Sequence, residues 1–141
     1  MFRNALSLVA IVTLLAACAP LQTRDLQPVT IEGTPGKAVV YLVRSDPDLS
    51  HLTAPVVVND QMIGSTHAGT YFRIELSAGR SVIRGYASDN GTISLDLAAD
   101  RIYFVQQTVA GSYRVTNPES FFRVIDETRA RAAMAGAQRL G

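Results

Sequence analysis

The amino-acid sequence predicts an all-β protein, a small antiparallel β-sandwich of about seven strands with a short C-terminal helix. Short runs rich in β-branched and apolar residues recur at intervals of about eight to twelve residues, and turn-forming residues separate them. Several runs alternate between apolar and polar residues, which is the pattern of a half-buried strand. The expected strands are residues 37–44, 55–59, 70–76, 81–87, 92–97, 101–109 and 121–125, with residues 62–64 beginning a return strand.

The first strand, residues 37–44 (KAVVYLVR), is apolar on both faces. Near-continuous apolar runs are typical of strands that are covered on both sides, so we expect an interior strand. Residues 70–76 and 92–97 instead alternate, and each is expected to bury one face only. The side chains expected to point inward are Phe72, Ile74, Leu76, Ile93, Leu95 and Leu97.

A hairpin is expected where residues 77–80 (SAGR) separate two of these strands. The expected register places Phe72 opposite Gly85, so that the ring covers a residue without a side chain. It also places Arg73 opposite Arg84 on the outer face, where neighbouring side chains or a bulge must relieve the like charges. Tyr and Arg are enriched where binding energy concentrates, so this face is a candidate binding surface. Its residues are Tyr71, Arg73, Arg84 and Tyr86.

Two local signals mark the later part of the chain. Asp89-Asn90-Gly91 predicts a type I′ hairpin turn, because such a turn needs positive φ at both central residues. Asp126 can cap a helix within residues 127–141, whose alanines and Met134 recur at helical spacing. This helix is weakly apolar, so we expect it to pack on the rim of the sheets or to fray.

Three segments in the middle of the chain read VVVND-QMIG, GTYFRIEL-SAG and RSVIRGYA. They resemble a family of small bacterial lipoprotein domains, DUF2846, and their hairpin pattern is similar to PEGA-type modules. The resemblance covers most of residues 36–125. The matching residues are Tyr41, Arg44, Val57, Val58, Asn59, Gly64, Gly69, Tyr71, Phe72, Leu76 and Gly79. They are turn and core positions, so the resemblance implies a fold and brings no activity with it. Ala78 departs from the pattern, which prefers Pro before the glycine.

The N-terminus has the layout of a secretory signal peptide. Arg3 precedes a largely apolar run over residues 5–15, and the run is too short to span a bilayer as a helix. It ends in Leu15-Ala16-Ala17-Cys18, which resembles the lipobox of bacterial lipoproteins. That resemblance implies cleavage between Ala17 and Cys18, with a diacylglycerol on the cysteine sulfur and a fatty acyl chain such as palmitate on the new N-terminus. The alternative is an ordinary signal peptide that leaves Cys18 as a free thiol, although a sole exposed cysteine is unusual in a secreted protein.

Acylation of Cys18 would tie the protein to a membrane, because two or more acyl chains anchor a protein stably. In the lipoproteins that this stretch resembles, an Asp after the cysteine retains the protein in the inner membrane. Ala19 stands there instead, so we expect the periplasmic face of the outer membrane. Residues 18–36 are rich in Pro and Gly without an apolar period, and are expected to form a flexible tether of roughly 60 Å before a domain over residues 37–126.

Composition and motifs exclude several kinds of chemistry. Without Arg3 the chain carries 12 basic and 12 acidic residues, whereas nucleic acid calls for a clustered basic surface. No metal-ligand spacing surrounds His51 or His67, and neither a cofactor nor a metal site is expected. We therefore expect a non-catalytic interaction or structural module that binds an envelope protein or another envelope component. The alternative is a small-ligand or glycan binder that uses the candidate binding surface.

Overall fold

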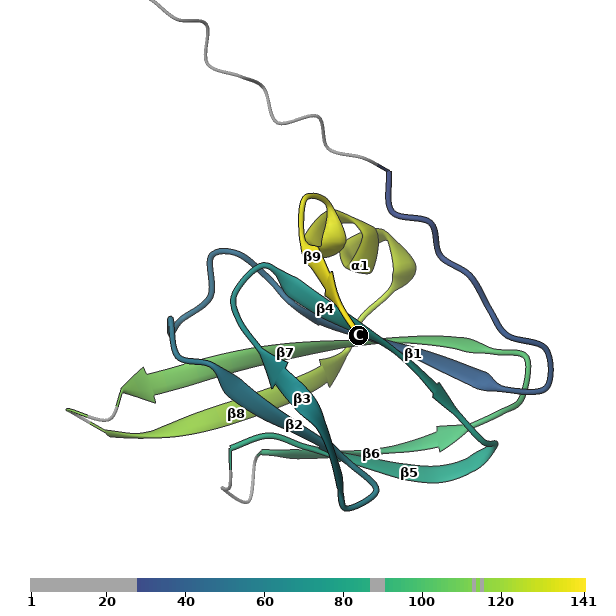
Figure 1. The fold of residues 1–141 in the computed structure, drawn as a ribbon, viewed down its shortest axis with the longest axis horizontal. Helices are drawn as coiled ribbons and strands as arrows, with labels where there is room; N and C mark the ends of the chain where they lie inside the picture. Colours follow the sequence, from purple (N-terminus) through teal and green to yellow (C-terminus); the bar gives the residue numbers. More distant parts are fainter. Residues whose placement is uncertain (1–27, 87–90, 113, 115) are drawn as a thin grey trace, which may run out of the picture.

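The computed structural model describes residues 28–86, 91–112, 114 and 116–141, which form two β-sheets and one helix (Figure 1). Within this part of the chain there are nine strands, so the fold is the all-β sandwich with a C-terminal helix that the sequence predicts. The elements are β1 (Ala38–Arg44), β2 (Ala54–Val58), β3 (Gln61–Thr66), β4 (Thr70–Leu76), β5 (Gly79–Arg84), β6 (Thr92–Leu97), β7 (Ile102–Ser112), β8 (Thr116–Val124), α1 (Glu127–Met134) and β9 (Gln138–Leu140).

The strand order differs from a simple antiparallel sandwich. A five-stranded sheet has the order β8-β7-β1-β4-β9, and a four-stranded sheet has the order β3-β2-β5-β6. Most neighbours are antiparallel, but β1 pairs with β7 and β4 pairs with β9 in parallel. The antiparallel pairing that the sequence predicts holds for the other neighbours, whereas these two parallel pairs each join strands that are far apart in the sequence.

Strand β1 lies at the centre of the five-stranded sheet, and all seven of its residues are buried. Val40 and Leu42 point into the core between the two sheets, whereas Val39, Tyr41 and Val43 belong to a second cluster on the outer face. That outer cluster is covered by α1 and by the segment before β1. The prediction of an interior strand covered on both sides is confirmed.

The predicted hairpin between β4 and β5 does not exist, because the two strands lie in different sheets. β4 pairs with β1 and β9, and β5 pairs with β2 and β6. The short connection between them therefore carries the chain from one sheet to the other. Phe72 still points into the core, but it covers Gly64 of β3 instead of Gly85. The inward-facing rows expected for β4 and β6 are as predicted, because both rows face the core between the sheets.

Residues 28–36, called here the N-terminal segment, do not behave as the free tether that the sequence predicts. They run along the outer face of the five-stranded sheet without forming a strand, and Val29 and Ile31 pack against the outer cluster. Their Pro and Gly content prevents regular pairing with the sheet, yet it does not prevent two apolar side chains from docking there. Residues 18–27 lie outside the described residues.

The C-terminal region confirms the helix and adds an unexpected strand. Asp126 caps α1 by accepting a hydrogen bond from the Arg129 backbone N–H at 2.8 Å, and Ala130 and Met134 are buried. Gly136 then adopts a positive φ of 74°, and the chain turns into β9 beside β4. α1 therefore packs on the face of the sheet and not on its rim. The predicted turn at residues 89–91 lies mostly outside the described residues, although β5 and β6 do pair as antiparallel neighbours.

The contact between Phe72 and Gly64 generates a stability prediction. Gly64 and Gly79 both have a positive φ, 150° and 122°, so an alanine at either position strains the backbone. Only at Gly64 would the added Cβ meet a ring, 2.8 Å from Phe72 Cζ, whereas nothing lies within 4 Å at Gly79. We expect Gly64→Ala to lower the free energy of unfolding by about 1 to 3 kcal/mol more than Gly79→Ala. Urea denaturation of the two variants measures the difference, and equal losses would contradict this packing.

Candidate functional site

The four residues of the predicted binding surface do not converge. Tyr71 and Arg73 lie on the outer face of β4, whereas Arg84 and Tyr86 lie at the end of β5 in the other sheet. Arg84 forms an ion pair with Asp60, and the Tyr86 hydroxyl donates a hydrogen bond to the Thr53 carbonyl. The prediction is wrong because it depended on pairing between β4 and β5. Of the four predicted residues, only Tyr71 and Arg73 lie on the same strand.

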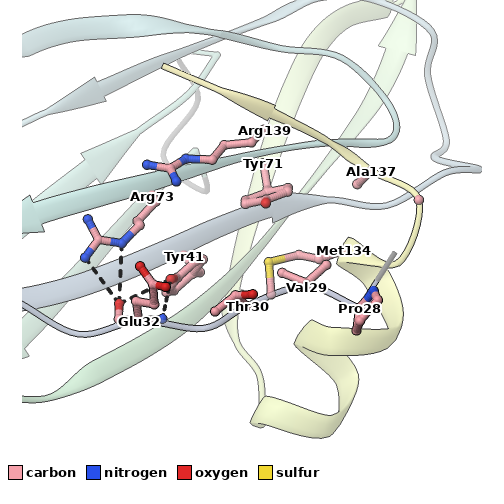
Figure 2. Close-up of a pocket in the computed structure, with 11 residues that line it drawn as sticks. Pro28, Val29, Thr30, Glu32, Tyr41, Tyr71, Arg73, Met134, Ala137 and Arg139 are labelled. Carbon is pink, nitrogen blue, oxygen red and sulfur yellow. Dashed lines mark hydrogen bonds between the residues drawn. The ribbon is translucent and has the colours of Figure 1, made fainter. Parts of the chain in front are cut away.

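Tyr71 and Arg73 line a cavity of about 460 Å³ on the outer face of the five-stranded sheet (Figure 2). One wall is the N-terminal segment, with Val29, Thr30 and Glu32. The opposite wall is the end of α1 and β9, with Met134, Ala137 and Arg139, and Tyr41 and Tyr71 lie between the walls. The cavity is thus built from three parts of the chain, and its volume is in the range of small-molecule sites.

The tyrosines of this cavity belong to a packed aromatic group. The ring centroids of Tyr41 and Tyr71 are 6.4 Å apart, and Tyr41 stacks on Phe104 at 5.8 Å. Tyr41 is only 2% exposed, and its hydroxyl accepts a hydrogen bond from the Glu32 N–H at 2.9 Å and donates one to the Glu32 carbonyl at 3.2 Å. Tyr41 therefore fixes the backbone of the N-terminal segment, and Tyr71 is the more accessible ring.

Arg73 attaches the same segment to β4. Its Nη1 donates to Glu75 Oε1 at 2.6 Å, and its Nη2 donates to the Glu32 carbonyl at 3.2 Å and to Thr34 Oγ1 at 2.8 Å. Thr34 Oγ1 in turn donates to Glu75 Oε1 at 2.6 Å. We call Tyr41, Arg73 and Glu75, with Glu32 and Thr34 of the segment, the clasp. Its geometry holds one wall of the cavity in place.

The clasp shifts the ionisation of its carboxylate. The hydrogen bond from Thr34, followed by the one from Arg73, lowers the pKa of Glu75 below its ordinary value. The reciprocal hydrogen bond to Glu75 raises the pKa of Arg73. Because the folded-state pKa of Glu75 is lowered, its contribution to the clasp is fully present above the ordinary carboxyl pKa and is lost as the pH falls through the lowered value.

The clasp predicts a pH-dependent attachment of the N-terminal segment. We expect the hydrogen-exchange protection factor of the Glu32 amide, which donates to Tyr41, to fall as the pH is lowered through the lowered pKa of Glu75. The Val39 amide, which donates to the Arg101 carbonyl, should stay protected and serves as the internal control. Glu75→Gln should remove the pH dependence at Glu32. A protection factor that stays unchanged while NMR shows the Glu75 carboxyl becoming protonated would contradict the proposed role of Glu75.

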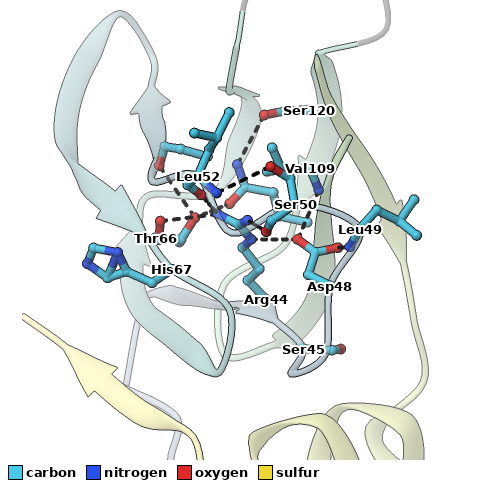
Figure 3. Close-up of polar contacts among 12 residues, drawn as sticks. Arg44, Ser45, Asp48, Leu49, Ser50, Leu52, Thr66, His67, Val109 and Ser120 are labelled. Carbon is cyan, nitrogen blue, oxygen red and sulfur yellow. Dashed lines mark hydrogen bonds and ion pairs between the residues drawn. The ribbon is translucent and has the colours of Figure 1, made fainter. Parts of the chain in front are cut away.

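A second polar group is buried and has a structural role (Figure 3). Arg44, the last residue of β1, is fully buried and donates from Nε to Asp48 Oδ2 at 2.6 Å. Its Nη1 and Nη2 donate to the backbone carbonyls of Leu52, Thr66 and Ser50 at 2.6, 3.2 and 2.6 Å. Because the guanidinium is already surrounded by acceptors of its own chain, it offers little to a ligand.

The Arg44 network predicts a large difference between two arginine variants. We expect Arg44→Gln to lower the free energy of unfolding by about 3 to 5 kcal/mol, because it leaves the Asp48 carboxylate buried without its cation. The matched control is Arg80→Gln, which breaks the ion pair with Asp96, whose side chains are 71% and 81% exposed. That change should cost no more than about 1 kcal/mol. Chemical denaturation measures the free energy of unfolding of both variants. Similar losses would show that the buried Arg44–Asp48 pair stabilises the fold no more than the exposed Arg80–Asp96 pair does.

A smaller cavity of about 400 Å³ lies near the turn between β3 and β4 and the end of α1. Asp46, His67 and Thr70 line it, together with alanines of α1. Among the described residues, no group of three or more His, Cys, Asp and Glu side chains is arranged to hold a metal ion. His51 and His67 are both exposed, as the sequence predicts for ordinary surface residues.

Comparisons with protein-family models, with curated proteins and with solved structures gave no match to this chain. The resemblance of residues 36–125 to DUF2846 and PEGA-type modules therefore stays a prediction from the sequence. In the part of the chain that the structure describes, there is no helix with the length and apolar character needed to cross a membrane.

Proposed function

We propose that the protein is a lipoprotein of the cell envelope, anchored through acyl chains on Cys18, and that its β-sandwich acts as a non-catalytic interaction or structural module. The sequence Leu15-Ala16-Ala17-Cys18 at the end of a short apolar run carries this proposal. Ala19, in place of an Asp, favours the periplasmic face of the outer membrane. The partner would be an envelope protein or another envelope component.

The docked N-terminal segment gives the proposal a spatial consequence. Because the chain is attached to the sheet from residue 28 onward, only residues 19–27 separate Cys18 from the domain. At about 3.3 to 3.6 Å per residue, these nine residues reach roughly 30 Å at most. That is half of the reach expected if the tether ran to Gly36. The proposed module would therefore work close to the membrane surface, with the side that carries α1 and the larger cavity near the point of attachment.

The charged residues of the domain support a binding or structural role over catalysis. Arg44 and Asp48 are buried together, and Arg73 and Glu75 hold the clasp. The Glu75 pKa is lowered, which favours a permanently ionised carboxylate over a general acid near neutral pH. These charged groups therefore hold parts of the domain together, including the N-terminal segment on the outer face of the five-stranded sheet.

Membrane attachment is tested by replacing the acylated residue. We expect Cys18→Ser to move the protein from the detergent-extracted membrane fraction to the soluble fraction, because the acyl chains are lost. The mature N-terminal peptide of the native protein should carry the added acyl mass in mass spectrometry. Retention of the variant in the membrane, or a native peptide without acyl mass, would refute the proposal.

Ala19→Asp is the matched variant for localisation. It keeps Cys18 and the tether length, so the protein should stay membrane-bound. In a cell with two membranes it should shift from the outer to the inner membrane fraction on a sucrose gradient. An unchanged distribution would remove the argument from Ala19 and leave the anchoring proposal intact.

One observation favours a second candidate function, the binding of a small ligand. The cavity beside the clasp has the volume of a ligand site and joins an accessible ring, Tyr71, to several polar side chains. The surface that the sequence predicts for such a ligand is divided between the two sheets. The proposed ligand site is therefore the cavity instead.

A further inference from the structure

Two residues of opposite charge, Glu32 and Arg139, line the larger cavity, and both are exposed to solvent. Within the described residues, neither side chain has a hydrogen bond or an ion pair; Glu32 takes part in the clasp only through its backbone N–H and carbonyl. Arg73, the other charged residue of the lining, is already paired with Glu75. Among the described residues that line the cavity, Arg139 and Glu32 are thus one cation and one anion whose side chains have no partner in the described part of the chain.

The fold holds these two charges on opposite walls. Arg139 is placed by the parallel pairing of β9 with β4, in which it lies opposite Tyr71. Glu32 is placed by the two hydrogen bonds between its backbone and the Tyr41 hydroxyl. Figure 2 shows Arg139 on the side of β9 and Glu32 on the side of the N-terminal segment, with the tyrosines between them. Because hydrogen bonds fix the backbone at Arg139 and at Glu32, the two charged residues are held on different sides of the cavity.

We propose that this cavity binds a short zwitterionic ligand, an amino acid or a peptide with a free amino group and a free carboxylate. The ligand carboxylate pairs with Arg139, and its ammonium group pairs with Glu32. Its aliphatic part lies over Tyr71. A volume of about 460 Å³ suits a peptide of two or three small residues. A simple anion would bring its charge against Glu32, and a simple cation would bring its charge against Arg139, so only a ligand with both charges satisfies both walls.

This proposal specifies the ligand class for the second candidate function and does not depend on acylation. The test uses the full-length protein purified in a non-ionic detergent, so its failure would leave the anchoring proposal untouched. The probes are the peptides Ala-Ala and Ala-Ala-Ala, measured by saturation-transfer NMR and by calorimetry at pH 7. N-acetyl-Ala-Ala lacks the ammonium charge and Ala-Ala-amide lacks the carboxylate charge, so each removes one of the two pairings.

We expect saturable binding of at least one free peptide and about tenfold weaker binding of each capped form, which is the effect of losing one charge-assisted hydrogen bond. Arg139→Gln should weaken the free peptide about tenfold and abolish the difference between Ala-Ala and its amide. Glu32→Gln should also weaken the free peptide about tenfold, and it should abolish the difference between Ala-Ala and N-acetyl-Ala-Ala. Both variants keep the clasp, because neither side chain takes part in it. Arg80→Gln, on an exposed strand of the other sheet, is the matched charge control and should bind as the wild type does.

Three results would overturn the proposal. One is the absence of saturable binding for both free peptides. Another is equal binding of the free and capped peptides, which would show that the charges do not direct the contact. The third is unchanged binding in Arg139→Gln and Glu32→Gln while the far-ultraviolet spectrum confirms that both variants are folded, which would place the site elsewhere.

Discussion

The guanidinium of Arg44 is the interaction on which the arrangement of this domain depends. β1 is buried on both faces, so its last side chain cannot reach water and must find acceptors inside the protein. The acceptors come from the loop after β1, through Asp48, Ser50 and Leu52, and from Thr66 of the opposite sheet. Asp48 also accepts a hydrogen bond from the Val109 N–H of β7 at 3.0 Å. The Arg44–Asp48 pair thus closes a loop, joins the two sheets and fixes a neighbouring strand.

The clasp on the outer face uses similar chemistry in a different environment. The side chains of Arg73 and Glu75 are 13% and 43% exposed, whereas those of Arg44 and Asp48 are 0% and 5% exposed. Solvent screens an exposed pair, so the clasp contributes less to stability than a buried pair does and is more easily opened. We therefore expect the core to unfold cooperatively and the attached segment to loosen separately. Only Val29 and Ile31 add apolar contacts to that attachment.

The sequence predicts those features that depend on neighbours along the chain. Alternation identifies the buried rows of β4 and β6, the apolar run identifies β1, and Asp126 identifies the start of α1. It does not distinguish a hairpin from a connection between sheets, because a short turn between two alternating strands looks the same in both cases. Because of that ambiguity, the sequence predicts Arg73 opposite Arg84, whereas the two residues lie in different sheets. β9 escaped prediction because three residues after a glycine carry too little periodicity, and its parallel pairing with β4 depends on the whole fold.

The candidate cavity lies where sequence reasoning is weakest, because three segments distant in the chain form it. Tyr71 and Arg73 could be selected from a strand pattern, but Glu32 sat in an expected tether and Arg139 in an expected helical tail. The wall that carries Glu32 also continues toward Cys18, the proposed anchor. Any ligand that binds Glu32 must therefore favour the docked state of the N-terminal segment, and by linkage any process that undocks the segment must weaken the ligand. The two proposals are therefore coupled, because the reach of the proposed membrane tether and the proposed binding of a ligand both depend on whether the N-terminal segment is docked.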